Sequence, residues 1–376
     1  MQPVRVGVIG CGYWGPNLIR NFVEMPEAQL VAVADLRSDR LAHIVACYPG
    51  VQVTDNFRDF FSMSLDAVVV ATPPPTHFRI ARECLEQGLS VLTEKPLTLD
   101  SRDAMELIEI ADSRNLTLMV GHTFLYNAAV RVLKELIDSG ELGQIHYIDA
   151  VRVSLGLFQP KVNVIWDLAP HDISILLYLL DSDPVLISAQ GTECIFKGKP
   201  DIAYLNLNFA DSTLAHVRIS WLDPCKVRRI TVVGSEKMVV YDDLENLEKI
   251  KIYDKGVEAL PYTDTYADFH CGYRYGNVVS PNIRFQEPLR VECQHFVECI
   301  VNNTRPRSCG QNGLKVVQVL EAAERSLYYG GVPQAISWDR DPAFHWSARS
   351  QKKNTGLLVE THSPGKEERS LEPLTA

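Results

Sequence analysis

The sequence predicts an α/β fold in which an N-terminal doubly wound parallel sheet precedes an α+β region with a large, mostly antiparallel open sheet. The first observation is that apolar strands alternate with helical segments over residues 1–121, as in parallel sheets covered by helices. The second is that strands follow one another without helices over residues 185–253, which is typical of an antiparallel sheet. The third is a glycine-rich turn directly after the first strand.

The first strand and its glycine turn lie in residues 4–15, VRVGVIGCGYWG. Gly10, Gly12 and Gly15 fit the G-x-G-x-x-G spacing of the dinucleotide-binding fingerprint, and a helix is expected to follow. The first glycine permits a sharp turn, the second lets backbone approach a pyrophosphate, and the third lets the helix pack on the strand. Because a helix N-terminus points unpaired N–H groups at phosphates, the pattern predicts a Rossmann dinucleotide site.

An acidic residue follows the second strand, residues 30–34, and it favours NAD as the dinucleotide. Asp35 lies twenty residues after Gly15, where a carboxylate accepts hydrogen bonds from a ribose 2′-hydroxyl and repels a 2′-phosphate. Arg37 and Arg40 are nearby and are the residues that would favour NADP instead. The alternative is a glycine turn in an unrelated α/β protein, with Asp35 capping the next helix.

The other elements of the first sheet follow in order. Asp100 is an expected N-cap and Gly88 an expected C-terminal cap, because these residue types satisfy helix ends. Ligands of such a sheet bind at the carboxyl ends of its strands, where residues 10–15, 72–77 and 94–96 fall. The expected strands are 30–34, 51–53, 65–71, 90–93 and 116–121, and the expected helices are 39–48, 76–87 and 101–114. The residues expected to bind the dinucleotide are Gly10, Gly12, Tyr13, Trp14, Gly15, Asp35, Thr72, Pro73, His77, Glu94 and Lys95.

From about residue 122 the pattern changes to the α+β region. A helix capped by Asn127 comes first, and a largely helical segment precedes the run of strands. The expected helices are 127–139, 162–180, 288–302 and 314–329, and the expected strands are 145–154, 185–196, 203–209, 213–221, 228–233, 238–242 and 249–253. The predicted division is a dinucleotide-binding domain over 1–122, a substrate-binding and oligomerisation domain over 123–343, and a disordered tail over 344–376.

The composition is that of an ordinary globular protein and excludes several functions. The chain has 376 residues, 46% of them hydrophobic, and a formal net charge of −10, which argues against a nucleic-acid binder with a basic face. The nine cysteines form no C-x-x-C pair, so no metal or redox site is predicted. Without a signal peptide or an apolar run of about 18 residues, the sequence predicts a cytoplasmic protein with reduced thiols and no membrane span.

Three residues form the predicted catalytic set. Lys95 lies in the loop after an apolar strand, where the nicotinamide is expected, and its amine is expected to lower the pKa of a substrate hydroxyl or to relay its proton. Pro96 restricts the backbone of Lys95 and so positions its side chain. Asp167 and His171 are spaced i, i+4, which places a carboxylate and an imidazole on one helix face for acid–base chemistry. The alternatives are a surface lysine paired with Glu94, and a structural His–Asp pair in a buried helix.

A second group of residues is expected near the substrate. Its members are His122, Tyr126 and Asn127, at the junction of the two domains, and the basic residues Lys161, Lys226, Arg228 and Arg229. In an acidic protein, the basic residues indicate either a solvated strand face or a pocket for a phosphate-bearing or carboxylate substrate. His77, which follows the run TPPPT, is expected to brace that loop.

These residues together resemble the glucose–fructose oxidoreductase, inositol dehydrogenase and MocA (Gfo/Idh/MocA) family over nearly all of residues 3–340. The likeness rests on GCGYWG, the ATPPPTH loop, the EKP tripeptide at 94–96, and Asp167 and His171 in Asp-x-x-x-His. It implies a Rossmann domain, a C-terminal domain whose open sheet often mediates oligomers, and oxidation or reduction of a ring hydroxyl with a nicotinamide cofactor. It also implies that Lys95 and His171 handle the proton while Asp167 supports them. Residues 162–165 replace a glycine-rich run of many members, which argues against simple polyols and monosaccharides.

Three segments are similar to one branch of that family, the sugar-nucleotide 3-dehydrogenases that act on UDP-N-acetylglucosaminuronate and its relatives. They are GHTFLYNAAVRVLKELI, VIWDLAPHDISI and ISWLDPCKVRRITVVGSEKMVVYDD. This likeness implies an NAD-dependent dehydrogenase that oxidises C3 of a UDP-N-acetyl-hexosaminuronate to a keto sugar, in a homo-oligomer (dimer or tetramer) built on the C-terminal sheet. The alternatives are an NAD(P)H-dependent keto-sugar reductase, an inositol or monosaccharide dehydrogenase, and a dinucleotide-binding regulator without turnover. The catalytic set argues against the regulator, because a sensor needs no proton-transfer groups.

Overall fold

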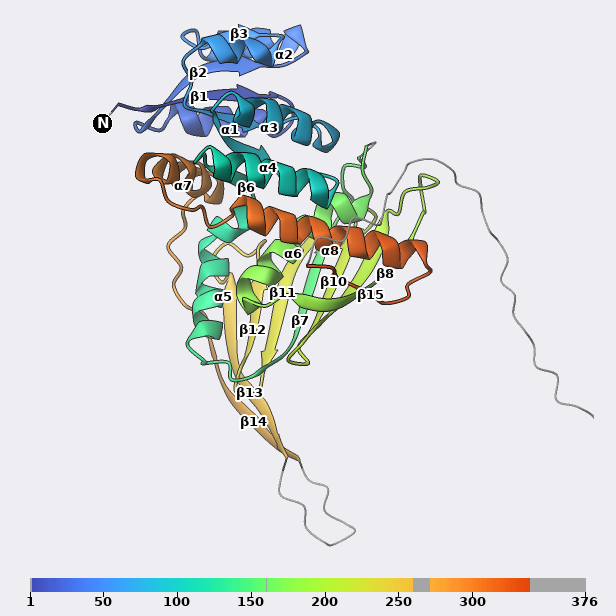
Figure 1. The fold of residues 1–376 in the computed structure, drawn as a ribbon. Coiled ribbons are helices and arrows are strands. Elements are labelled where there is room, and N and C mark those ends of the chain that lie inside the picture. The colour runs from blue at the N-terminus through green and yellow to red at the C-terminus, as the bar shows by residue number, and fades with distance from the viewer. Residues whose placement is uncertain (1, 160, 260–270, 339–376) are drawn as a thin grey trace, which may run out of the picture. The chain divides into compact units, whose positions relative to one another are not determined.

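The computed structural model describes residues 2–159, 161–259 and 271–338, and Figure 1 shows how their elements are arranged. Met1–Arg340 belong to one compact unit that contains two sheets. The predicted division into domains at residue 122 stays a prediction. The tail predicted for residues 344–376 lies outside the described residues.

Six parallel strands form the first sheet, in the order β3-β2-β1-β4-β5-β6. This is the doubly wound order of a Rossmann sheet, so the predicted fold class is confirmed for this region. The strands are β1 (Val4–Ile9), β2 (Ala28–Ala34), β3 (Gln52–Thr54), β4 (Ala67–Val70), β5 (Ser90–Glu94) and β6 (Leu118–Gly121). The connecting helices are α1 (Gly15–Val23), α2 (Ser38–Cys47), η1 (Phe57–Ser62), η2 (Pro74–Thr76), α3 (His77–Glu86) and α4 (Ser101–Ser113).

Two predicted helix caps of this sheet are confirmed. The Asp100 side chain accepts a hydrogen bond from the Arg102 N–H, 2.9 Å away, and satisfies the start of α4. Gly88 follows α3 with φ +83°, a left-handed conformation that glycine adopts without a steric penalty. These caps set where α3 and α4 meet the loops that carry the site.

Nine strands form the second sheet, in the order β14-β13-β12-β11-β7-β10-β9-β8-β15. Only β7 and β10 pair in parallel among its described strands, so the sheet is mostly antiparallel as predicted. The strands are β7 (Ile145–Val153), β8 (Pro184–Thr192), β9 (Ile202–Phe209), β10 (Leu214–Ser220), β11 (Val227–Gly234), β12 (Met238–Asp242), β13 (Ile250–Ala259), β14 (Cys271–Val279) and β15 (Gln334–Ala335). The sequence analysis missed β14 and β15, because β14 contains two glycines and β15 is two residues long.

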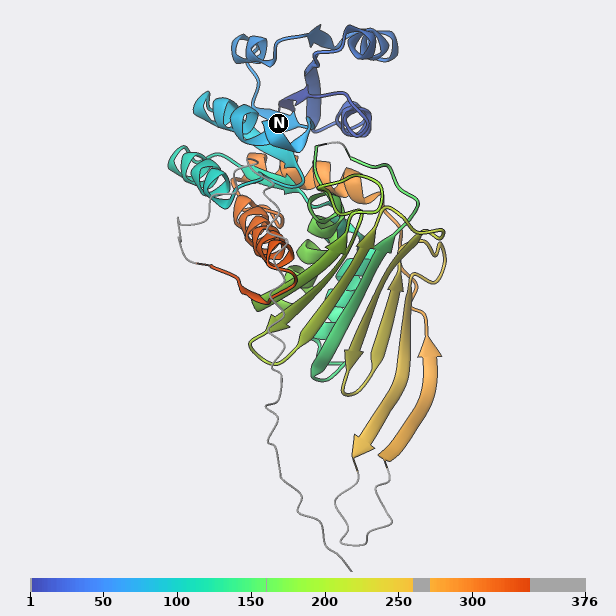
Figure 2. The same ribbon diagram turned by 90° about the vertical axis from the view of Figure 1, so that its right-hand side faces the viewer.

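One face of the second sheet is covered by helices and the other is open. Helices α5 (Ala128–Asp138) and α6 (Val164–Leu180) pack on the covered face, and their buried leucines and isoleucines share one core with the strands. Figure 2 shows the strands from the open face, with helices behind them. Tyr147, Tyr204 and Leu214 are 45%, 42% and 50% exposed on that face.

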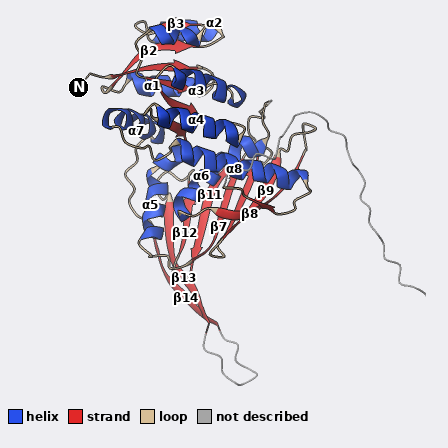
Figure 3. Ribbon diagram, viewed as in Figure 1, coloured by secondary structure: helices blue, strands red, loops and turns tan. Residues whose placement is uncertain are grey.

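The last two helices return to the first sheet. Helix α7 (Pro288–Asn302) packs Leu289 and Phe296 into the core beside α1 and β1, and α8 (Gly310–Tyr328) contacts α4 on one side and α6 on the other. A Cβ at Gly313 would lie 2.7 Å from a methyl carbon of Val120, so this position on α8 requires glycine. Figure 3 shows α8 (blue) extending from the level of β6 across to β8. The C-terminal helices therefore contribute to the cores of both sheets.

The described part of the chain has free thiols, no membrane-spanning helix and no metal-binding cluster. The eight cysteines whose side chains the structure describes are free thiols: Cys11, Cys47, Cys84, Cys194, Cys225, Cys293, Cys299 and Cys309. No helix among the described residues has the length and apolarity needed to cross a membrane. The same residues contain no group of three or more His, Cys, Asp or Glu side chains placed to hold a metal ion. The cytoplasmic location stays a prediction.

Candidate active site

The glycine turn after β1 has the backbone geometry that a bound pyrophosphate requires. Gly10 has φ +96°, and a Cβ at Gly15 would overlap the carbonyl oxygen of Gly10. At Gly12, the atoms near an added Cβ belong to the flexible guanidinium of Arg40, so the backbone there is open to a ligand. The N-cap of α1 is Trp14, whose side chain makes no capping hydrogen bond. The helix N-terminus therefore remains available to an anion.

Asp35 joins the end of β2 to this turn. Its carboxylate accepts hydrogen bonds from the N–H of Cys11 at 2.8 Å and of Arg37 at 2.9 Å. The alternative in which Asp35 is the N-cap of the next helix is wrong, because α2 is capped by Arg37. A guanidinium nitrogen of Arg40 lies 4.0 Å from the Asp35 carboxylate, so the acid expected at the ribose has a positive neighbour.

His77 connects the loops that follow β4 and β5. Its Nδ1 lies 2.8 Å from the carbonyl oxygen of Pro96, and its Nε2 lies 2.7 Å from that of Thr72. The ring is fully buried, and its burial lowers its pKa. The expected role of His77 as a brace is thus confirmed, whereas its contact with a dinucleotide stays a prediction.

Lys95 is held at the end of β5 by the first turn of α6. Its Nζ donates to the main-chain oxygen of Asp167 at 2.6 Å and to the carboxylate at 3.3 Å, and the Lys95–Pro96 peptide is cis. The other carboxylate oxygen of Asp167 accepts from the indole N–H of Trp221 at 3.0 Å. The predicted alternative, a surface lysine paired with Glu94, is wrong, because the ion pair is with Asp167 and the lysine side chain is only 18% exposed.

His171 lies on the same helix as Asp167 but is not its hydrogen-bond partner among the described residues. Pro170 falls inside α6, and the Asp167 carboxylate is already occupied by Lys95 and Trp221. His171 Nδ1 is buried and no described residue is its hydrogen-bond partner, and the ring packs edge-on against Phe124 with 5.2 Å between centroids. Burial lowers the pKa of His171 well below its usual range, and the positive charges of Lys95, Arg152 and Arg228 lower it further. The imidazole is therefore neutral at physiological pH.

His122 brings a second imidazole to this place. It follows β6 and is 1% exposed, and both of its ring nitrogens are buried without a hydrogen-bond partner in the part of the chain that the structure describes. Burial, followed by the positive charge of Lys95, lowers the pKa of His122 to about 3. Since a buried polar group without a hydrogen bond costs free energy, two unpartnered imidazoles beside one lysine indicate a site built for a polar ligand.

Two further carboxyl groups belong to this region, those of Glu94, next to Lys95 in the sequence, and of Glu292. Glu94 packs against Gly121, and burial raises the pKa of its carboxyl to about 7. Glu292 of α7 is fully buried and accepts from the Thr123 hydroxyl at 2.9 Å; burial and the charge of Glu94 raise its pKa. The sequence analysis missed Glu292, although a glutamate between Leu289 and Phe296 on an apolar helix face was a signal for it. It also missed Trp221 and Phe124, for which no local pattern existed.

The other residues predicted near the substrate fall in different places. Tyr126 and Asn127 bond to protein groups: the Tyr126 hydroxyl to His295 and Ser308, and the Asn127 amide to Tyr241 and Asp243 while its oxygen caps α5. Lys161 and Lys226 are exposed in the loops before α6 and β11.

The predicted basic cluster on β11 is divided between the two faces of the sheet. Arg228 pairs in register with the buried Arg152, on the helix-covered face, whereas Arg229 pairs in register with Asp242 and forms an ion pair with it at 2.9 Å. Successive side chains of a strand point to opposite faces, so Arg228 alone of these two can reach the site. Its nearest acid is Asp243, at 3.5 Å.

Two family models match this chain, and both describe one class of protein. The model described as "Oxidoreductase family, NAD-binding Rossmann fold" matches residues 4–122, and the model of the GFO/IDH/MocA C-terminal domain matches residues 130–240. The protein is thus an oxidoreductase of the NAD-binding Rossmann class. More narrowly, the chain belongs to the Gfo/Idh/MocA family, as the sequence analysis predicted.

The chain is similar to several oxidoreductases. A UDP-N-acetylglucosamine 3-dehydrogenase of Acidithiobacillus ferrooxidans is 30% identical over 331 residues, covering 86% of this chain and 96% of the relative. The scyllo-inositol 2-dehydrogenase (NAD(+)) of Bacillus subtilis is 26% identical, covering 81% and 88%. The crystal structure of a putative oxidoreductase from Magnetospirillum magnetotacticum is 30% identical with a TM-score of 0.74, covering 86% and 100%.

Proposed function

We propose that this chain is an NAD-dependent dehydrogenase that oxidises a ring hydroxyl, at C3, of a sugar nucleotide such as a UDP-N-acetyl-hexosaminuronate. The observation that carries the proposal is Lys95, held by Asp167, beside the unpartnered imidazole of His171. This arrangement provides a cation and a neutral base at the carboxyl end of β5, where a nicotinamide binds in a sheet of this topology. Asp167 and Trp221 are the residues that position them.

The proposed chemistry removes a hydride and a proton from one CH–OH group. NAD, when bound, supplies the acceptor for the hydride that leaves the carbon. His171 accepts the hydroxyl proton, because its imidazole is neutral, and the positive charge of Lys95 lies where the substrate oxygen becomes negative. In the reverse assignment Lys95 takes the proton and His171 orients the hydroxyl. The C–H and O–H bonds break and a C=O bond forms, so the product is a keto sugar.

The residues present fit NAD as the cofactor. The open backbone at Gly12 and the uncapped start of α1 suit a pyrophosphate, and the Asp35 carboxylate suits a ribose 2′-hydroxyl. Tyr13 and Trp14 are exposed beside the turn, while Thr72 and Pro73 follow β4 on the same sheet edge. Arg40, next to Asp35, is the residue that would accommodate a 2′-phosphate, so NADP is the competing choice.

The sugar-nucleotide substrate is supported by likeness and by charge. The relative from Acidithiobacillus ferrooxidans acts on UDP-N-acetylglucosamine, and its identity extends over most of both chains. Arg228 lies on the covered face of the second sheet, where its guanidinium suits a diphosphate or carboxylate. Inositols are the second candidate substrates, because the similar Bacillus subtilis enzyme is an inositol dehydrogenase.

The test is the absorbance of reduced nicotinamide with purified protein, NAD and a panel of substrates. The panel contains UDP-N-acetylhexosamines, UDP-uronic acids, free inositols and hexoses, with a 2-keto acid added in parallel as a hydride acceptor. Signal with one nucleotide sugar supports the proposal. Signal with inositols or hexoses alone would keep the family and reject the substrate. Silence throughout, with dinucleotide still bound, would favour the reductase or the regulator.

We also infer a homo-oligomer built on the open face of the second sheet. Tyr147 and Leu214 lie in register on neighbouring strands of that face, Tyr204 lies farther along β9 opposite Arg218, and exposed apolar side chains of this kind mark protein contacts. Light scattering of the purified chain should give the mass of a dimer or tetramer. A Tyr204→Arg substitution should lower that mass, and a monomeric wild-type protein would contradict the inference.

A further inference from the structure

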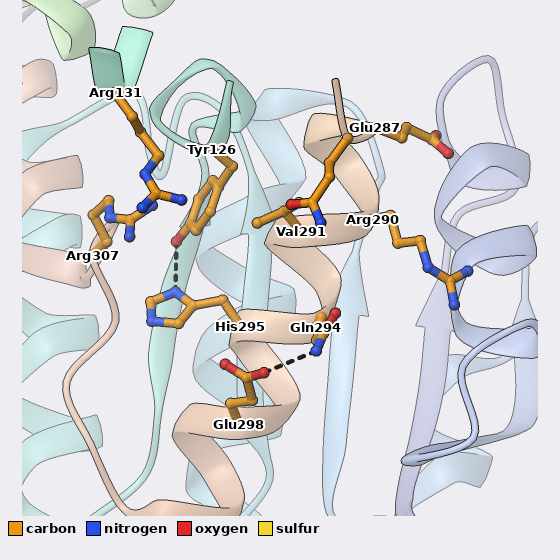
Figure 4. A pocket seen from close by; sticks show the side chains of 10 residues that line it. Tyr126, Arg131, Glu287, Arg290, Val291, Gln294, His295, Glu298 and Arg307 are labelled. Carbon is orange, nitrogen blue, oxygen red and sulfur yellow. Dashed lines mark hydrogen bonds between the residues drawn. The ribbon is translucent and has the colours of Figure 1, made fainter. Parts of the chain in front are cut away.

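A cavity lies behind the short helix that carries part of the candidate active site. Helix η3 (Thr123–Tyr126) directs Phe124 toward His171, whereas Tyr126 lines a cavity of ≈ 450 Å³ between η3, α5 and α7. Figure 4 shows this cavity with Arg131 of α5 and Arg307 beside Tyr126 and with the α7 side chains opposite. Its volume is that of a site for a small metabolite.

Some charged side chains around the cavity have an ionic partner, and others have none among the described residues. On the α7 side, Glu287 pairs with Arg20 at 2.5 Å and Arg290 pairs with Glu24 at 3.4 Å. Glu298, at another end of the cavity, accepts a hydrogen bond from Gln294. Glu287 and Arg290 therefore have ionic partners, whereas Glu298 has a neutral hydrogen-bond partner and keeps its negative charge. The positive charges for which the described residues supply no ionic partner lie on the opposite wall.

Two arginines on that opposite wall have no carboxylate partner among the described residues. The guanidinium of Arg307 lies 5.2 Å from the centroid of the Tyr126 ring and donates to the carbonyl oxygen of Leu125 at 3.2 Å. Arg131 lines the same cavity from the exposed side of α5. In Figure 4 both guanidinium groups point to the same end of the cavity. Two cations directed at one place repel each other unless an anion lies between them.

A polar edge completes this end of the cavity. The Tyr126 hydroxyl and His295 Nδ1 are 3.0 Å apart, and His295 Nε2 lies 3.4 Å from the Cys299 sulfur. Burial, with the positive charge of Arg307, lowers the pKa of His295, which keeps the imidazole neutral beside the two arginines. The wall thus has two guanidinium groups, which bind phosphate or carboxylate oxygens bidentately. The neutral polar groups beside them add no charge.

We propose that this cavity is a second ligand site, which takes a small oxyanion-bearing metabolite through Arg131 and Arg307. The ligand carries a phosphate or a carboxylate group, since both present the planar or forked oxygens that guanidinium groups bind. The site is distinct from the dinucleotide turn and from Lys95, because η3 separates it from them. Helix α7 contacts both ends of η3, because its Glu292 is hydrogen-bonded to Thr123 and its His295 to Tyr126.

The test is isothermal titration of the full chain with pyrophosphate and, separately, with citrate. Saturating NADH is present throughout, so that the dinucleotide turn is filled. Saturable binding of one probe is expected, and it identifies whether the oxyanion is phosphate or carboxylate. Arg131→Gln and Arg307→Gln should each weaken that binding about tenfold or more, which corresponds to about 1.4 kcal/mol.

Matched variants locate the binding. Arg82→Gln removes a surface arginine paired with Glu86 and Glu106 and is the control, so it should leave the affinity unchanged. Arg228→Gln removes the arginine proposed for the substrate site and shows whether the probe binds there instead of in the cavity. If Arg307→Gln fails to fold, Arg307→Lys and the exposed Arg131 variant carry the test. Binding that Arg228→Gln abolishes, binding that neither cavity variant changes, or no heat from either probe would overturn the proposal.

Discussion

Three histidines of the candidate site, His77 and His122 after strands of the first sheet and His171 on α6, differ in one respect. Both ring nitrogens of His77 contact backbone carbonyl oxygens, whereas both ring nitrogens of His122 and Nδ1 of His171 have no hydrogen-bond partner among the described residues. An unmet buried polar group is costly, so a protein keeps one where a ligand will satisfy it. The comparison teaches that His77 stabilises the loops, and it supports the proposal that His122 and His171 contact the substrate. The difference between a structural histidine and a ligand-binding one can be tested by substitution.

The largest effect is expected from Lys95→Ala on the ligand side. Removing the cation that faces the substrate oxygen should lower kcat by roughly 10²–10⁴-fold, the range of acid–base and charge contributions. NADH binding, followed by fluorescence, should persist because the glycine turn is untouched. Lys237→Ala, at a surface lysine paired with Glu141, is the control and should turn over normally. Near-normal turnover in Lys95→Ala would refute the assignment.

His171→Asn is expected to cost somewhat less, about 10²-fold in kcat/KM. The wild-type profile of kcat/KM should show no loss between pH 8 and pH 6.5, because the pKa of His171 lies well below 6.5 and its neutral form persists there. His43→Asn, on the exposed face of α2, serves as the control. A wild-type acid limb centred near pH 6.5 would show that this imidazole is not the buried, cation-flanked group described.

On the structural side, His77→Ala should destabilise the fold while sparing the chemistry. A neutral imidazole donates to only one of the two carbonyl oxygens, those of Thr72 and Pro96, so the variant leaves one buried carbonyl without its donor and removes a buried ring, which costs roughly 2–4 kcal/mol by thermal or urea unfolding. The folded fraction should keep a kcat within about threefold of wild type, a small change beside the loss expected at Lys95. An unchanged melting temperature with lost activity would reverse the roles of the histidines.

His122 gives the smallest effect, on acid stability. Its pKa is lowered to about 3 in the folded state, so between pH 6.5 and pH 3 the unfolded state binds the extra proton and the fold loses stability as pH falls. His122→Phe removes this penalty, and the difference in unfolding free energy between pH 7 and pH 5 should shrink by about 2 kcal/mol. Equal acid sensitivity in both proteins would mean that the ring is already solvated or paired.

The sequence predicted the parts of the fold whose signals are local. The glycine turn, Asp100 as a cap, the parallel strands and the mostly antiparallel second sheet are each encoded in a few neighbouring residues, and the structure agrees. Helix α8 begins at Gly310 rather than at 314, because its first turn carries no apolar residues and is set by Cys309 and Asn312 instead. The strand expected to end at 253 continues as β13 to Ala259.

The site was predicted only as far as side chains lie near one another along the chain. Asp167 and His171 were expected to act as a pair, but Lys95 and Trp221, 72 and 54 residues away, take the Asp167 carboxylate. Strand alternation separates Arg228 from Arg229, and this follows from the register with β7 and β12 rather than from their sequence. Partners brought together by tertiary packing have no local pattern, which is why Glu292 and Phe124 were missed.

The comparison of the histidines can be measured directly by nitrogen NMR of the side chains. The chain has ten histidines, and single His→Asn variants assign their signals. On addition of NAD and the sugar nucleotide that gives turnover, the ring nitrogens of His122 and His171 should shift as they gain hydrogen-bond partners, while those of His77 stay in place. Shifts at His77 with unchanged signals at His122 and His171 would contradict the account.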